Sequence, residues 1–132
     1  MKGRSEPIWI GYHDCLAIHE ILIARFGGAS GVRKPDALQS AIDRPKNLFV
    51  YDKVTIPQMA ASIASGIITN HPFIDGNKRT GFVAAITFIE ANGLIFNADE
   101  IDAYKFTMAL AAGEITESQY GEFLSEFSTP LT

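Results

Sequence analysis

The sequence predicts an all-α protein, a bundle of about six helices around one buried central helix, with a small hairpin or loop. Apolar residues recur at helical spacing in most segments, and helix-starting and helix-ending residues separate those segments. One segment is apolar on nearly every side, as a central helix must be. At 132 residues the chain has the length of one ordinary domain, so we expect a single domain over residues 1–132.

The first two predicted helices cover residues 12–26 and about 35–44. In the first, apolar residues lie three or four positions apart, and the glycine pair that follows ends it. The second starts at Pro35, which suits a first helical turn. We expect it to end at Arg44-Pro45, because a proline disfavours helical backbone in the residue before it.

Two residues on the apolar stripe of the first helix have reactive side chains. Cys15 has no second cysteine to pair with, and we interpret it as a small buried hydrophobe rather than a nucleophile. His19 lies one turn later, and we interpret it as a hydrogen-bonded core residue. Neither residue is expected to carry chemistry.

Residues 46–56 are predicted to form a mobile loop or a small hairpin. Aromatic and β-branched residues flank a turn at Asp52-Lys53, and no helical stripe runs through the segment. The next helix opens at Pro57 and ends near residue 70. Its alanines and glycine would let neighbouring helices approach closely.

The fourth helix, over about residues 78–92, is the one that is apolar nearly all round. We therefore place it in the middle of the bundle. A brief extended link over residues 94–96 leads to a helix over about residues 99–112. Thr116 and Gln119 have the spacing of a capping box, which predicts a last helix through about residue 127.

The most unusual segment is a polar loop between two strongly apolar helices, His71-Pro72-Phe73-Ile74-Asp75-Gly76-Asn77-Lys78-Arg79, called the signature loop below. Gly76 and Asn77 lie just before the first turn of the next helix, where free N–H groups and the helix dipole attract an anion such as phosphate. Lys78 and Arg79 add positive charge at the helix end that basic residues destabilise. A bound polyphosphate would explain them.

Two further residues of the signature loop suit phosphate chemistry. Asp75 offers oxygen ligands to Mg²⁺, which binds one or two carboxylates and completes its shell with phosphate and water oxygens. His71 could take the proton from an attacking hydroxyl. Phe73 is expected to be a buried anchor. Each polar residue alone has a structural explanation, such as capping by Asn77, but their combination predicts a site.

The run His71 to Thr80 resembles the signature loop of the Fic/Doc family, in its death-on-curing branch. The upstream segments look similar too, and nearly the whole chain is covered: Ala17-Ile18-His19, Arg25-Phe26-Gly27-Gly28, Gly31-Val32-Arg33 and Ser40-Ala41-Ile42-Asp43-Arg44-Pro45. This resemblance implies a helical bundle in which His71 is the general base and Asp75 binds Mg²⁺. It also implies that Asn77, the loop amides and Arg79 hold the phosphates of ATP or another nucleotide.

The resemblance has further implications for the reaction and the partners. Residues 46–56 would be the family's flap, which binds an extended stretch of the target protein by strand addition. Adenylylating members have Gly in place of Lys78 and a second Arg in place of Phe82. The Lys form looks like the death-on-curing toxin, and proteins similar to that toxin transfer the γ-phosphate to a hydroxyl of elongation factor Tu. Phosphoryl transfer is therefore our first hypothesis, with a translation factor as target.

Two alternatives stay open at this point. Adenylyl or other nucleotidyl transfer could use the same residues, and a catalytically silent binding module would need none of them. Self-inhibiting members carry a Ser/Thr-x-x-x-Glu-Gly/Asn helix, which the sequence lacks, so a separate antitoxin protein is expected.

Composition and charge limit the choice of partner and compartment. The net charge of -4 argues against a nucleic-acid binder, because such domains usually carry a basic face. Neither a secretory signal nor a membrane-spanning apolar run is found, so the expected compartment is the cytoplasm.

Overall fold

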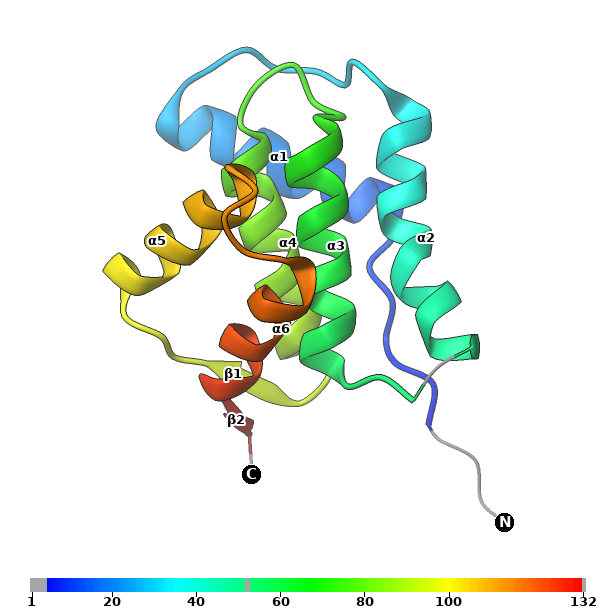
Figure 1. Ribbon diagram of the computed structural model, residues 1–132. Helices are drawn as coiled ribbons and strands as arrows, with labels where there is room; N and C mark the ends of the chain where they lie inside the picture. Colours follow the sequence, from blue (N-terminus) through cyan, green and yellow to red (C-terminus); the bar gives the residue numbers. More distant parts are fainter. Residues whose placement is uncertain (1–4, 52, 132) are drawn as a thin grey trace.

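A computed structural model describes residues 5–51 and 53–131. The described chain is mostly helical, as predicted, with one small antiparallel sheet (Figure 1). Not one of the described helices is both long enough and apolar enough to cross a lipid bilayer. The elements follow in the order α1 (Tyr12–Phe26), α2 (Pro35–Tyr51), α3 (Ile56–Asn70), α4 (Asn77–Ala91), β1 (Leu94–Phe96), α5 (Glu100–Ala111), α6 (Glu117–Glu126) and β2 (Ser128–Pro130).

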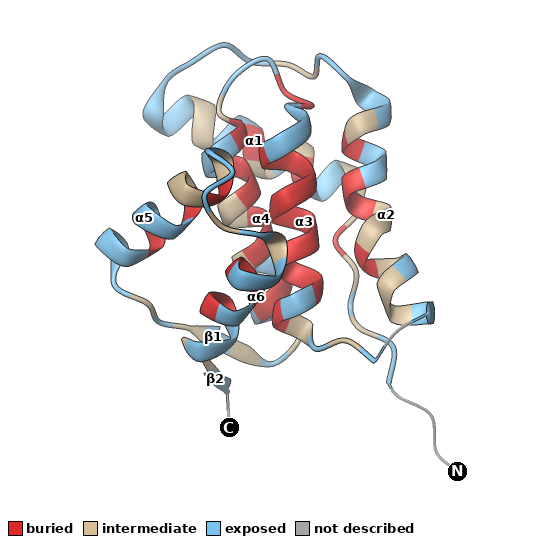
Figure 2. Ribbon diagram, in the orientation of Figure 1, coloured by how far each residue is buried: buried red, intermediate tan, exposed pale blue. Residues whose placement is uncertain are grey.

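The central helix of the bundle is α3, and the prediction that residues 78–92 occupy the centre was wrong. Helix α3 packs against α2, α4, α5 and α6, and eleven of its residues are buried, as the red ribbon of Figure 2 shows. Its alanines, serines and glycine leave room for neighbours on several sides. Helix α4 also packs against α3, but Phe82, Val83 and Ile86 on its other side are only half-buried.

Two glycines mark the closest approaches of α3 to its neighbours. A Cβ atom on Gly66 would lie 2.7 Å from the Cβ atom of Ala41 on α2. A Cβ atom on Gly81 of α4 would lie 2.7 Å from Cγ1 of Ile68 and 3.2 Å from the carbonyl oxygen of Ala64, both on α3. The helix spacing on both sides of α3 therefore depends on residues without a side chain.

Gly81→Ala is expected to destabilise the protein, whereas Gly121→Ala is expected to stabilise it. At Gly81 the clash should lower the free energy of unfolding by about 1–3 kcal/mol. This loss outweighs the increase of about 0.5–1 kcal/mol expected from replacing a glycine within a helix. At Gly121 of α6 the nearest atom, Cβ of Ala61, would be 3.5 Å from the new methyl group, an ordinary contact. Urea unfolding of both variants measures the difference, and equal midpoints would contradict the close approach at Gly81.

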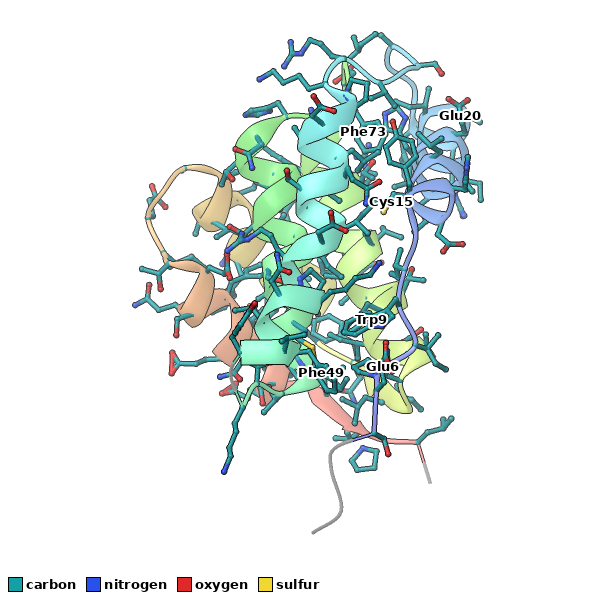
Figure 3. The ribbon with its side chains drawn as sticks, turned by 90° about the vertical axis from the view of Figure 1, so that its right-hand side faces the viewer. Glu6, Trp9, Cys15, Glu20, Phe49 and Phe73 are labelled. Atoms are coloured by element: carbon teal, nitrogen blue, oxygen red, sulfur yellow. The ribbon has the colours of Figure 1, made fainter. Side chains whose placement is uncertain are left out.

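Helix α2 does not end at Arg44-Pro45 as predicted, but continues through Pro45 to Tyr51. Proline removes one N–H group from the helix, a local cost that packing outweighs here. Pro45 is buried, and Phe49 one turn later packs edge-on against Trp9 with ring centroids 5.8 Å apart (Figure 3). The predicted loop or hairpin over residues 46–56 is therefore helical up to Tyr51, and its turn residue Asp52 lies outside the described residues.

In the C-terminal part, the two predicted helices are present as α5 and α6, and the structure also contains a strand that was not predicted. Thr116 Oγ1 accepts a hydrogen bond from the Gln119 amide at 3.1 Å, and Gln119 Oε1 accepts one from the Thr116 amide at 2.8 Å, which confirms the capping box. The extended link at residues 94–96 is β1, and it pairs antiparallel with β2, with Ile95 opposite Thr129. The strand β2 was not predicted.

Cys15 is fully buried, which confirms its interpretation as a small hydrophobe. Burial raises the pKa of its thiol from 9.0 to about 12, with a smaller contribution from the nearby charge of Asp14. Such a thiol remains protonated and does not act as a nucleophile near neutral pH.

The raised pKa of Cys15 predicts a loss of stability at alkaline pH. The unfolded chain releases the thiol proton above about pH 9, whereas the folded chain holds it until about pH 12. The stability that depends on the neutral thiol is thus complete below pH 9 and declines as the pH rises towards 12. Urea unfolding of the wild type and of Cys15→Ala from pH 8 to 10.5 should show a steeper decline in the wild type; parallel curves would contradict the prediction.

Candidate active site

The signature loop connects α3 to α4 and begins with a backbone conformation unusual for a histidine. His71 is the C-cap of α3, in the left-handed region with φ 50° and ψ 58°. It is the one non-glycine residue with positive φ in the described chain. Strained backbone of this kind persists where surrounding contacts enforce it, and it is common at functional sites. The His71 side chain is exposed, on the side where the loop meets solvent.

The connection between α1 and α2 holds the first half of the signature loop. The backbone amides of Arg33 and Lys34 both donate to the Pro72 carbonyl, at 2.7 Å and 2.9 Å, and Val32 forms a bridge with Phe73. A guanidinium nitrogen of Arg33 also lies 3.4 Å from the His71 carbonyl oxygen. Figure 1 shows the two loops side by side at the top of the bundle.

Phe73 and Asn77 tie the loop to the start of α4. Phe73 is fully buried beside α1, so its predicted burial is confirmed (Figure 3). Asn77 is the first residue of α4, and its side chain accepts from the Phe73 amide at 2.9 Å and donates to the Phe73 carbonyl at 3.0 Å. Both polar atoms of the Asn77 side chain are thus engaged with the loop backbone, although the residue also lines the cleft described below.

Asp75 is exposed, and backbone amides orient its carboxylate. One oxygen accepts from the Gly76 amide at 2.8 Å and the other from the Ala29 amide at 3.3 Å. Gly28 passes so close that a Cβ atom there would lie 2.8 Å from the Asp75 carboxylate. Each oxygen retains a free lone pair for a further ligand.

The first turn of α4 is suited to bind an anion. Its N-cap, Gly76, has φ 75° and provides no side chain to cap the helix. The first backbone N–H groups of a helix have no partner within it, and the helix dipole adds partial positive charge. Lys78 and Arg79 are exposed at this end, and the Arg79 guanidinium lies 4.1 Å from the ring centroid of Phe26, the last residue of α1.

One cleft brings together all the predicted site residues except the buried anchor Phe73. Its volume of about 940 Å³ is at the upper end of the range for small-molecule sites. The signature loop and the end of α1 form one side, and residues of α4, of β1 with the link after it, and of α5, most of them apolar, form the rest. The residues that line it are Leu22, Phe26, His71, Ile74, Asp75, Gly76, Asn77, Lys78, Arg79, Phe82, Val83, Ile86, Phe96, Ala98, Glu100, Ala103, Tyr104, Thr107 and Met108.

A dedicated metal cage is not part of this cleft. Within residues 5–51 and 53–131, no three His, Cys, Asp or Glu side chains are grouped so as to hold a metal ion. Mg²⁺ does not require such a group, because one carboxylate together with phosphate oxygens and water is a common set of ligands. The exposed Asp75 carboxylate, beside the first turn of α4, fits this requirement.

Sequence reasoning missed the residues of α1 and its following loop that complete the site. Phe26 contacts Arg79, Ala29 contacts Asp75, and Arg33 contacts His71. The interpretation of His19 as a hydrogen-bonded core residue is confirmed, but its partner, the Asp75 carbonyl, was not anticipated. The signal that could have found them was the family-like sequence of these upstream segments.

The fold and the signature loop together define a member of the Fic/DOC family. A model of that family matches residues 9–89, more than half of the chain, and the chain belongs to it. The resemblance drawn from the sequence is thereby confirmed.

Two individual relatives are informative. The chain is 29% identical over 117 residues to the protein kinase doc of Escherichia phage P1, an alignment that covers 87% of this chain and 91% of the phage protein. It is 39% identical over 77 residues to the toxin Doc of Mycolicibacterium smegmatis (strain ATCC 700084 / mc(2)155), covering 56% of this chain and 58% of that toxin.

Proposed function

We propose that this protein is the toxin of a toxin–antitoxin pair and a protein kinase, which transfers the γ-phosphate of Mg²⁺-bound ATP to a Ser or Thr hydroxyl of another protein. The observation that carries the proposal is the placement of His71, Asp75 and the start of α4 on one cleft. The similarity to the phage kinase and the mycobacterial toxin supports the same class of activity. We expect an antitoxin in trans and a translation factor, first of all elongation factor Tu, as target.

The proposed roles follow from the chemistry of each residue. The exposed imidazole of His71 accepts the proton of the target hydroxyl as its oxygen attacks the γ-phosphorus. The free amides of the first turn of α4, with Lys78 and Arg79, hold the phosphate oxygens and offset their negative charge. The Asp75 carboxylate holds Mg²⁺, which supplies further charge neutralisation to the phosphates when bound. The bond between the γ-phosphorus and the β–γ bridging oxygen breaks, and ADP leaves.

The position of Phe82 favours phosphoryl transfer over nucleotidyl transfer. Adenylylating relatives are expected to have an arginine there, whereas this chain has an aromatic ring that lines the cleft and packs edge-on against Phe96 with centroids 6.0 Å apart. A second phosphate-binding guanidinium is thus replaced by an apolar surface. Lys78 adds bulk and charge where glycine would leave room for close approach of the phosphates.

The position of the radioactive label in the product decides between the two reactions. The protein is incubated with a cell extract and Mg²⁺, using ATP labelled at the γ-phosphate in one sample and at the α-phosphate in another. Compared with a His71→Ala control in the same extract, we expect additional label on a protein only from γ-labelled ATP, and mass spectrometry should show a gain of one phosphate, about 80 Da. Additional label only from α-labelled ATP would establish nucleotidyl transfer. No additional label from either, with a folded protein, would support the binding module.

A further inference from the structure

His19, a buried residue of α1, contacts Phe73 and Asp75 of the signature loop and lies close to Gly76. Its side chain is 1% exposed, and its ring stacks on that of Phe73 with centroids 3.9 Å apart and an angle of 9°. Its Nε2 atom lies 2.8 Å from the Asp75 carbonyl oxygen. A Cβ atom on Gly76 would lie 3.8 Å from the same nitrogen. The proposed mechanism assigns no role to this residue.

The contact with Asp75 fixes the direction of the hydrogen bond. A carbonyl oxygen can only accept, so Nε2 of His19 carries the hydrogen and donates it. Because His19 is buried, water competes little for its N–H group, and loss of this donor would remove a hydrogen bond that the Asp75 carbonyl oxygen makes within the protein.

The same peptide group connects His19 to the Asp75 carboxylate. The Asp75 carbonyl and the Gly76 N–H belong to one planar peptide unit, so fixing one fixes the direction of the other. The Gly76 N–H donates to a carboxylate oxygen of Asp75 at 2.8 Å. A change in the hydrogen bond from His19 would therefore rotate the amide that orients the carboxylate.

We propose that His19 is a positioning residue, which holds the Asp75–Gly76 peptide so that the Asp75 carboxylate faces the cleft in the orientation needed to bind Mg²⁺ and nucleotide. The identity of the ligand in this inference rests on the proposed function. The contacts of His19 are observed independently of that function. The stacked ring and the N–H group have separable tasks. The ring supports the Phe73 anchor, and the N–H group sets the peptide.

Two variants of His19 and one matched control separate these tasks. His19→Phe keeps a ring of similar size against Phe73 but has no donor. His19→Gln keeps an N–H donor without the ring. Cys15→Ala serves as the control, because Cys15 is fully buried on the same helix one turn earlier and is not part of the site.

The first measurement is amide hydrogen exchange of the free protein, which needs no ligand. In His19→Phe the Gly76 amide should exchange at least tenfold faster than in the wild type, and in Cys15→Ala, at equal global stability, it should not. His19→Gln should restore much of the protection. Unchanged exchange at Gly76 in a folded His19→Phe protein would overturn the proposal, as would an equal increase in Cys15→Ala.

The second measurement is calorimetric titration with ADP, with and without Mg²⁺. We expect Mg²⁺ to strengthen ADP binding in the wild type and in Cys15→Ala, and this strengthening to fall at least tenfold in His19→Phe, with little change in affinity without Mg²⁺. Equal loss with and without Mg²⁺ would overturn the positioning role. Absence of Mg²⁺-dependent binding in the wild type would refute the proposed function, while the exchange measurement still decides the role of His19.

Discussion

His71→Asn is expected to reduce γ-phosphate transfer by about 10²–10⁴-fold, the usual contribution of a general base. Asparagine tolerates the left-handed backbone that His71 adopts as the C-cap of α3. The substitution should therefore remove the imidazole without disturbing the loop, and the melting temperature and MgADP affinity should change little. The transfer rate from γ-labelled ATP in cell extract measures the effect.

A second histidine-to-asparagine change provides the control for this experiment. His13 is exposed on α1 and does not line the cleft, so His13→Asn should transfer phosphate at the wild-type rate. Wild-type transfer by His71→Asn would show that another group takes the proton. Loss of MgADP affinity together with activity would instead mean that His71 acts by shaping the loop.

Phe73→Ala is expected to lower the free energy of unfolding by about 3–5 kcal/mol, the usual cost of removing a fully buried phenylalanine. Phe73 is completely inaccessible to solvent and stacks on His19, and its backbone is held by Asn77. Its loss leaves a cavity under the signature loop. Urea unfolding measures the stability, and calorimetric titration with MgADP, under conditions where the variant is folded, measures the site.

Phe88→Ala distinguishes loss of stability from loss of the site. Phe88 is equally buried on α4, but it stacks on Trp9, on the side of α4 that faces the N-terminal segment. Both variants should be destabilised to a similar degree, whereas only Phe73→Ala should lose MgADP affinity once folded. If both folded variants bound MgADP like the wild type, Phe73 would be a core residue with no bearing on the loop.

The positions of most helices could be predicted from local signals. The boundaries of α1, α3 and α4 agree with the sequence to within about a residue, because glycines, prolines and polar caps mark them. Helix α2 is the exception. A local rule ends it before Pro45, but burial of Pro45 and the contact of Phe49 with Trp9 carry the helix to Tyr51.

Which helix occupies the centre of the bundle could not be predicted from the residues of each helix alone. Apolar residues all round predicted α4 at the centre, but one of its faces lines the cleft instead of the core. Helix α3 lies at the centre because its small residues let other helices pack on several of its sides. Only the packed bundle shows that α3, rather than α4, has helices on those sides.

The candidate site divides in the same way. The sequence by itself determined the family and the residues that suit phosphate chemistry, His71, Asp75, Lys78 and Arg79, because they lie within one short polar run that leads into a helix start. Only the tertiary structure decided what holds them: His19 under the Asp75 peptide, Phe26 under Arg79, and the loop after α1 against Pro72. These contacts join residues that are 38 to 56 positions apart in the sequence (72 − 34 = 38, 75 − 19 = 56), so no local pattern encodes them.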